Sequence, residues 1–141
     1  MDKGYGKVLI RTLVDLKKLS AKKKYKDDEE FEYIDISSID NVANEITSTT
    51  KYTMKDAPSR AQQCLKYDDI LVSTVRPNLK NIARFRGENF GYVGSSGFCV
   101  LRATKCNPSY LMHNVLSDDF TESMTKLTTG ASYPAIRDDE F

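Results

Sequence analysis

Residues 57–83, APSRAQQCLKYDDILVSTVRPNLKNIA, predict more of the fold than any other stretch of the chain. Residues 60–66, RAQQCLK, have helix-forming side chains and predict a short helix, which is followed by a turn at 66–69. Residues 70–75, ILVSTV, form a short β-branched apolar run, which predicts a buried strand. Pro77 ends this strand because proline has no N–H for a ladder, and residues 81–85, NIARF, are expected to return as its partner.

Further strands are predicted on both sides of this stretch. Residues 98–103, FCVLRA, form a second strongly strand-like run, and residues 31–37, FEYIDIS, alternate with the period of two that a strand requires. Residues 8–10, VLI, are apolar enough to begin a strand. Residues 46–58 are polar and rich in threonine, which predicts a loop or an edge strand. Most of the predicted strands therefore lie in the middle of the chain.

Helices are predicted near both ends. The leucines between residues 13 and 19 recur at helical spacing, which predicts a short amphipathic helix. Asn107 and Pro108 suit the cap and first position of a helix over residues 108–116. Asp119 and Glu122 have the spacing of a capping box for a second helix, for which Gly130 is a candidate end. We expect an α+β fold in a single compact domain over residues 1–141, with mixed or antiparallel strands in the middle flanked by short helices.

Length and composition narrow the class of protein. The 141 residues suit one domain, and 40% of them are hydrophobic. No apolar run approaches the roughly 20 residues of a membrane span, and the N-terminus lacks the apolar region of a signal peptide, so a cytoplasmic protein without a membrane partner is expected. The three cysteines, Cys64, Cys99 and Cys106, are odd in number and widely spaced, which argues against a disulfide framework and against a zinc site.

Charge is distributed unevenly although the net charge is only +1. Residues 1–26 hold nine lysines and arginines and two acids, and residues 46–105 hold ten bases and four acids. Residues 27–45 hold eight acids and no base. Two interpretations remain open from charge alone: an ordinary mixed surface, or a basic face that binds a polyanion.

Short matches to catalytic motifs are better explained without catalysis. CNPSY at 106–110 resembles the loop of adenine amino-methyltransferases, but Ser109 replaces the second proline and no glycine-rich loop for a methyl donor follows an N-terminal strand. SMTK at 123–126 lacks the partner motifs of acyl-enzyme hydrolases. GYVGSSG at 91–97 has neither P-loop nor dinucleotide-binding spacing, and it predicts either a mobile loop or a loop whose backbone N–H groups lie close to a ligand. His113, the single histidine, has no candidate nucleophile to activate as a general base, and it is expected to be a surface or partly packed histidine.

The middle of the chain instead concentrates side chains that suit nucleic acid. Arginine forks match guanine edges and phosphates, and asparagine and glutamine match adenine. Many of these side chains lie beside predicted turns, where they can project from a scaffold. The set consists of Arg60, Gln62, Gln63, Arg76, Asn78, Lys80, Asn81, Arg84 and Arg86.

Four stretches, in order, resemble the target recognition domain of type I restriction–modification specificity subunits. RTLVDL (11–16) resembles the opening helix of that family, and YIDISSIDN (33–41) resembles its first signature strand and turn. Residues 57–83 resemble its most recognisable block, and TTGASYPAIRDDEF (128–141) resembles the closing loop before a spacer helix. The resemblance therefore extends over nearly the whole chain.

The resemblance implies a DNA-reading role without catalysis or a cofactor of its own. Such domains bind one half of a bipartite double-stranded DNA target in the major groove. A methyltransferase subunit that uses S-adenosylmethionine is the direct partner, and a motor-nuclease restriction subunit is an indirect one. The expected DNA contacts are phosphate or guanine contacts from Arg60, Arg76, Lys80 and Arg84, base-edge contacts from Gln62, Asn78 and Asn81, and loop contacts from Ser95, Ser96, Ser132 and Tyr133.

Two features depart from the family pattern. Specificity subunits hold two recognition domains joined by spacer helices, whereas this sequence ends at Phe141, where the first spacer helix is expected, so a fragment and a natural half-subunit are both open. LSAKKKYK (19–26) lacks the glycine often found after the opening helix. The alternative function is a non-catalytic module that docks on a methyltransferase subunit or forms a homodimer. A hydrolase that uses Ser123 and Lys126 is the third candidate.

Overall fold

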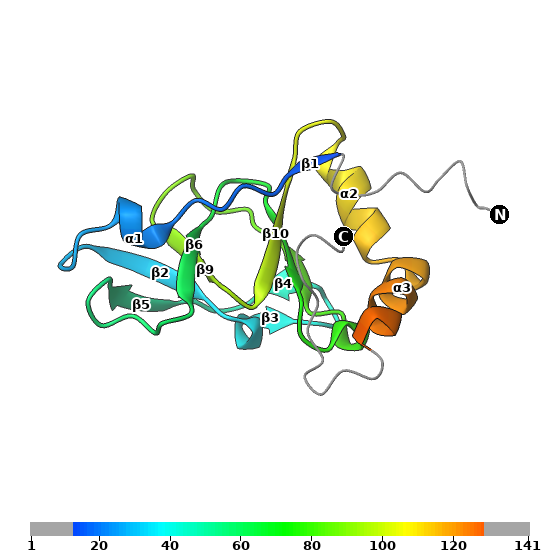
Figure 1. The fold of residues 1–141 in the computed structure, drawn as a ribbon, viewed down its shortest axis with the longest axis horizontal. Coiled ribbons are helices and arrows are strands. Elements are labelled where there is room, and N and C mark those ends of the chain that lie inside the picture. The colour runs from blue at the N-terminus through cyan, green and yellow to red at the C-terminus, as the bar shows by residue number, and fades with distance from the viewer. Residues whose placement is uncertain (1–12, 129–141) are drawn as a thin grey trace.

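Two four-stranded sheets and a short two-stranded sheet form the framework of the computed structural model, which describes residues 13–128 (Figure 1). The first sheet has the order β1-β10-β7-β8, and the second has the order β5-β2-β9-β6. Three helices accompany the sheets within residues 13–128: α1 (Ala21–Lys24), α2 (Pro108–Val115) and α3 (Asp118–Thr128). The predicted α+β class is confirmed.

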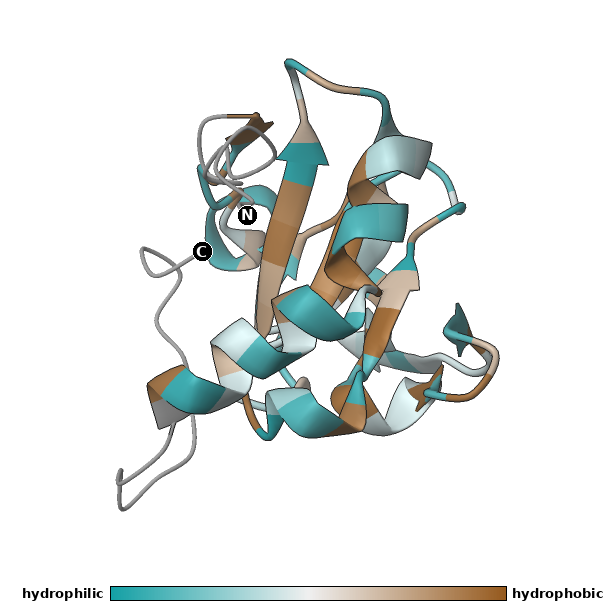
Figure 2. Cartoon of the chain, turned by 90° about the vertical axis from the view of Figure 1, so that its right-hand side faces the viewer, coloured by the Kyte–Doolittle hydropathy of each residue, from teal (hydrophilic) through white to brown (hydrophobic). Residues whose placement is uncertain are grey.

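The first sheet is antiparallel throughout and carries the largest apolar cluster. Its strands are β1 (Val14–Asp15), β10 (Phe98–Ala103), β7 (Ile70–Ser73) and β8 (Ile82–Arg84). Helices α2 and α3 lie against one face of this sheet (Figures 1 and 2), where Leu111, Val115 and Met124 pack on Val72 and Leu101. The helices thereby bury one face of β7, and the second sheet helps bury the other.

The second sheet mixes parallel and antiparallel pairs. Its strands are β5 (Thr50–Thr53), β2 (Glu30–Ile34), β9 (Tyr92–Ser95) and β6 (Ala61–Cys64), and β2 runs parallel to β9. Phe31, Tyr33 and Val93 pack with Ala21 of α1 on one face. Side chains from both sheets meet in a further cluster that contains Ile34, Leu65, Leu71, Ala83, Phe85 and Phe98. The two sheets therefore share one continuous interior.

Short elements complete the edge at which the two sheets meet. The 3-10 turn η3 (Ile36–Ser38) begins at Asp35, whose carboxylate accepts from the Ile36 N–H at 2.8 Å. Strands β3 (Ile39–Asp40) and β4 (Glu45–Ile46) form a small hairpin beside β8. A second 3-10 turn, η4 (Pro77–Leu79), joins β7 to β8.

Several predicted elements are confirmed. Strand β7 with its return strand β8, strand β10 and helix α2 occupy the expected positions. Helix α3 also forms, but its first turn is capped by Ser117 rather than Asp119, because the Ser117 hydroxyl accepts from the Phe120 N–H at 3.2 Å. The strand predicted at 8–10 and the helix end predicted at Gly130 lie outside the described residues.

Four predictions were wrong. Residues 61–64 form a strand instead of a helix, because β6 pairs with β9 and buries Ala61 and Gln63. Residues 13–19 form no helix: Val14–Asp15 form strand β1, in which Val14 pairs with Ala103 of β10, and residues 16–19 have no regular secondary structure. The loop predicted at 91–97 contains strand β9. The strand predicted over 31–37 ends at Ile34, where the Asp35 cap begins η3.

Candidate nucleic-acid interface

Arg60 and Ser96 lie side by side at one edge of the sheets. The Ser96 N–H donates to the Arg60 carbonyl at 2.8 Å, and the pairing of β6 with β9 continues inward from this contact. The Gly97 carbonyl accepts from both the N–H and the hydroxyl of Thr74, at 2.9 and 3.0 Å. The end of β7, the β9–β10 turn and the start of β6 are therefore fixed to one another by backbone bonds.

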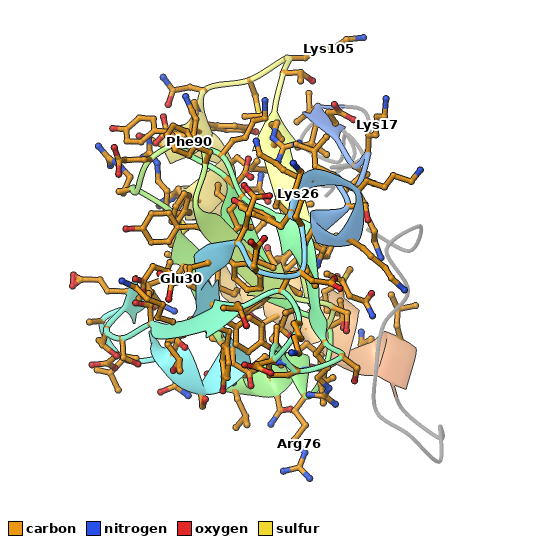
Figure 3. All side chains as sticks on the ribbon, turned by 90° about the vertical axis from the view of Figure 1, so that its left-hand side faces the viewer. Lys17, Lys26, Glu30, Arg76, Phe90 and Lys105 are labelled. Atoms are coloured by element: carbon orange, nitrogen blue, oxygen red, sulfur yellow. The ribbon has the colours of Figure 1, made fainter. Side chains whose placement is uncertain are left out.

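The η4 loop projects from the same edge. Arg76, Asn78 and Leu79 are exposed, and Figure 3 shows Arg76 pointing away from the body of the molecule. Arg76 and Lys80 have left-handed backbones, with φ of 49° and 52°, which non-glycine residues adopt only at an energetic cost. We call the exposed residues Arg60, Arg76 and Asn78, together with the half-buried Ser96, the recognition edge.

Two asparagines hold the strained loop in place. The Asn44 side-chain amide donates to the carbonyls of Lys80 and Ile82 at 2.9 and 3.0 Å. The Asn41 amide donates to the Leu79 carbonyl at 3.0 Å. The β3–β4 hairpin thus supports the loop from behind and leaves the side chains of Arg76 and Asn78 facing solvent.

Lys80 is predicted as a DNA contact, and its ammonium bonds within the protein. Its Nζ donates to the Leu116 carbonyl at 3.1 Å and lies 2.7 Å from the Asp118 carboxylate. The hydrogen bond from Lys80 holds the pKa of Asp118 below its ordinary value. Lys80 therefore ties η4 to the junction between α2 and α3.

Arg84 is also bonded inside the protein. Its Nε donates to the Asp68 carboxylate at 2.9 Å, and its Nη1 donates to the Ser109 hydroxyl at 2.9 Å. These bonds join β8 to the turn before β7 and to the first turn of α2. The guanidinium of Arg84 braces the fold in this arrangement.

The remaining predicted contacts divide between surface and interior. Gln62 is exposed on β6, and its amide donates to the Ser59 carbonyl at 2.9 Å. Ser95 is fully buried, and its hydroxyl accepts from the Gly97 N–H at 3.0 Å. Asn81 is half-buried and its carbonyl accepts from the Ser73 N–H. Ser132 and Tyr133 lie outside the described residues.

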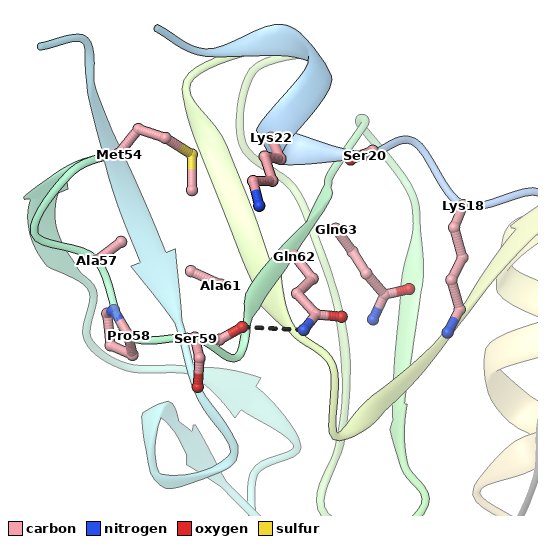
Figure 4. Close-up of a pocket in the computed structure, with 10 residues that line it drawn as sticks. All are labelled: Lys18, Ser20, Lys22, Met54, Ala57, Pro58, Ser59, Ala61, Gln62 and Gln63. Carbon is pink, nitrogen blue, oxygen red and sulfur yellow. Dashed lines mark hydrogen bonds between the residues drawn. The ribbon is translucent and has the colours of Figure 1, made fainter. Parts of the chain in front are cut away.

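A groove lies beside the recognition edge, between α1 and residues 54–63 (Figure 4). Its volume is about 450 Å³. In this view Lys22 extends from α1 toward Gln62, and Lys18 lies on the other side of Gln62 and Gln63. The lining contains no acid and consists of Lys18, Ser20, Lys22, Met54, Ala57, Pro58, Ser59, Ala61, Gln62 and Gln63.

An exposed patch combines Arg86, which the sequence offered as a side chain suited to nucleic acid, with two aromatic side chains that were not predicted. The Arg86 guanidinium lies 5.2 Å from the centre of the Tyr67 ring, and its Nη2 donates to the Tyr67 hydroxyl at 2.9 Å. Phe90 is 67% exposed and follows Asn89, whose side chain accepts from the Tyr67 N–H at 2.9 Å. We call Tyr67, Arg86 and Phe90 the aromatic patch. In the view of Figure 3, Phe90 and Arg76 lie toward opposite ends of the molecule.

A buried ion pair supports the turn that carries Tyr67. The Asp69 side chain is fully buried and accepts from Arg102 at 2.8 and 2.6 Å, and from the Lys66 N–H at 2.8 Å. Burial raises the pKa of Asp69, although its bonds to Arg102 and Lys66 oppose the rise. This carboxylate is enclosed by its partners and has a structural role.

Metal and nucleophile chemistry find no support in the described part of the chain. No group of three histidine, cysteine, aspartate or glutamate side chains is placed to hold a metal ion within residues 13–128. Burial raises the pKa of the thiols of Cys64 and Cys106, which disfavours the reactive thiolate. None of the described helices is long and apolar enough to cross a membrane.

Comparison with solved structures gives close matches. The chain is 34% identical to a chain from a structural study of complex assembly and conformational transition in the type I R-M system, with a TM-score of 0.83. It is 33% identical to the HsdS subunit of Thermoanaerobacter tengcongensis, with a TM-score of 0.81. Each match covers 94% of this chain but only 35% and 34% of the matched chains, so the sequence spans about a third of their length.

No protein-family model and no curated protein matches the chain. The structural matches combine fold and sequence similarity over nearly its whole length, with TM-scores above 0.8. The chain therefore belongs, as a target recognition domain, to the family of type I restriction–modification specificity (HsdS) subunits.

Proposed function

We propose that this chain reads one half of a bipartite DNA target in the major groove for a type I methyltransferase and restriction complex. The recognition edge carries this proposal. It places two exposed arginines, an asparagine and a serine on turns that backbone and asparagine bonds hold rigidly. Rigid projections of this kind suit base reading, which requires donors and acceptors at fixed positions.

The proposed roles follow from exposure and chemistry. Arg60 and Arg76 are exposed, so their guanidinium groups can contact phosphates or guanine. The exposed amide of Asn78 suits an adenine edge. Lys80 and Arg84 act behind these residues by fixing η4 and β8. Phosphate contacts orient the protein, whereas base contacts provide specificity, so substitutions within the edge should separate the two effects.

Recovery of bound duplexes from a pool of random-sequence DNA tests the proposal. The full chain should enrich a short common sequence. On that sequence Asn78→Ala should lose about 1–3 kcal/mol of binding free energy and should bind unrelated duplexes as the wild type does. Absence of an enriched sequence, together with equal binding of all duplexes, would contradict a reading role.

The chain itself is proposed to be non-catalytic, with a methyltransferase subunit as its protein partner and the restriction subunit as an indirect one. The aromatic patch favours a protein contact, because tyrosine, phenylalanine and arginine are enriched at protein interfaces. Tyr67 is 47% exposed and Phe90 is 67% exposed. The same patch supports the second candidate function, a docking or homodimerisation module without DNA binding.

Light scattering separates these two candidates. A homodimer would show a mass that rises with concentration and returns to the monomer value in Phe90→Ser. A monomeric mass at all concentrations, with retained DNA binding, favours the DNA-reading function. The exposed Val42, in the β3–β4 turn, offers a matched control substitution, Val42→Ser, outside the aromatic patch.

A further inference from the structure

We propose that the groove between α1 and residues 54–63 binds backbone phosphates of the DNA duplex whose bases face the recognition edge. This inference rests on the proposed function because its ligand is that same duplex. It adds Lys18 and Lys22, which lie outside every contact predicted from the sequence. The groove would position the domain on DNA without reading sequence.

The charge of the groove points to an anion. Lys18 and Lys22 both line it, and none of its ten lining residues is acidic (Figure 4). Lys22 forms no ion pair with another residue in the 13–128 range. Residues 17–26, which include α1, are basic throughout. Their exposed lysines are Lys17, Lys18, Lys22, Lys23, Lys24 and Lys26. Lysine acts as a mobile point charge, which suits phosphate contacts that need little directional precision.

Neutral polar groups also line the groove. Ser59 is exposed, and the exposed amide of Gln62 is oriented by its bond to the Ser59 carbonyl. Serine hydroxyls and glutamine amides are common donors to DNA phosphates. Met54, Ala57, Pro58 and Ala61 supply an apolar lining. Lysines and neutral hydrogen-bond donors, without acids, favour the negatively charged phosphodiester backbone of DNA. A positively charged partner would need acidic side chains in the groove.

The location links the groove to the recognition edge. Gln62 lines the groove and lies two residues from Arg60, which belongs to the edge. Two residues span roughly 7 Å along a strand at about 3.3 Å per residue. Duplex DNA carries one negative charge per about 1.7 Å of its axis. Arg60 and the groove wall that carries Gln62 therefore lie within reach of one duplex.

The salt dependence of binding tests the inference. A fluorescein-labelled duplex of mixed sequence is titrated with the full chain at several potassium chloride concentrations. Each lost phosphate contact should reduce the slope of log affinity against log salt by about 0.9. Lys22→Ala should show one such reduction, and the Lys18→Ala, Lys22→Ala double variant should show about two. Lys22→Arg retains the charge and should keep the wild-type slope.

Lys105→Ala is the matched control, because Lys105 is an exposed lysine in the loop before α2 and does not line the groove. A wild-type slope in Lys22→Ala, or an equal loss in Lys105→Ala, would overturn the groove assignment while leaving DNA binding intact. Failure of the wild-type chain to bind the duplex at low salt would instead overturn the proposed function, and the groove assignment with it. Circular dichroism confirms that each variant is folded.

Discussion

Replacing Arg102 with methionine removes the cationic partner of a fully buried carboxylate. Asp69 would keep its bond from the Lys66 N–H but lose the two bonds from Arg102 at 2.8 and 2.6 Å. Breaking a buried pair from one side costs about 3–5 kcal/mol. The Arg102 side chain is 20% exposed, so we expect the lower end, about 3 kcal/mol. In a domain of this size that loss lowers Tm by roughly 6–12 °C.

The loss should depend on pH in a defined direction. Burial already raises the pKa of Asp69, and removal of Arg102 takes away the main contribution that lowers it. The folded variant then holds a proton to higher pH than the unfolded chain does. This uptake stabilises the variant fully below the unfolded value of about 3.9, and the benefit disappears as pH rises through the folded pKa. The difference from wild type should therefore be largest at neutral pH and smaller in mild acid.

Urea unfolding followed by circular dichroism measures the effect. Arg86→Met is the matched control, because Arg86 is exposed and its 3.5 Å pair with Asp68 should contribute no more than about 1 kcal/mol. Adding Asp69→Asn to the Arg102→Met variant removes the buried charge and should recover part of the stability. An Arg102→Met variant as stable as Arg86→Met, with no pH dependence, would refute the assignment of a buried ion pair.

Two other predictions concern packing and the η4 anchor. A Cβ at Gly87 would lie 2.5 Å from Cζ of the buried Phe85 ring. Gly87→Ala should therefore lower the free energy of unfolding, measured in urea, by about 1–3 kcal/mol. Unchanged stability would mean that the ring is not packed against Gly87. Lys80→Met should raise the pKa of Asp118 toward its ordinary value, because the hydrogen bond from Lys80 lowers that pKa. An NMR titration of Asp118 measures the change, and an unaltered pKa would show that the contact is absent in solution.

Local sequence patterns predicted the elements whose formation depends on nearby residues. The apolar run of β7, the return strand β8 after Pro77 and the Asn107 cap of α2 are each specified within a few residues. The failures depend on distant partners. Residues 61–64 have reasonable helix propensity, but pairing with β9, some thirty residues away, determines that they form a strand. The burial of Gln63 has the same origin, since its amide donates to Ser95 and Phe98.

The candidate site shows the same limit. Residue type and proximity to turns correctly placed Arg76 and Asn78 in an exposed loop. They did not show that Lys80 bonds to Leu116 and Asp118, because those partners lie 36 and 38 residues along the chain. The groove lysines were missed because the charge of residues 17–26 was visible but the wall opposite them, at 54–63, was not. The sequence indicates which side chains are able to bind DNA. It does not indicate which of them are bonded within the protein by tertiary contacts and which face solvent.

Titration of duplex DNA with the full chain over a range of salt tests the DNA-reading account most directly. The logarithm of the binding constant should fall linearly with the logarithm of the salt concentration. The slope should be about 0.9 for each phosphate contact. Arg76→Ala should weaken binding because Arg76 projects from the recognition edge (Figure 3). An affinity that is independent of salt, or no binding at low salt, would contradict the account.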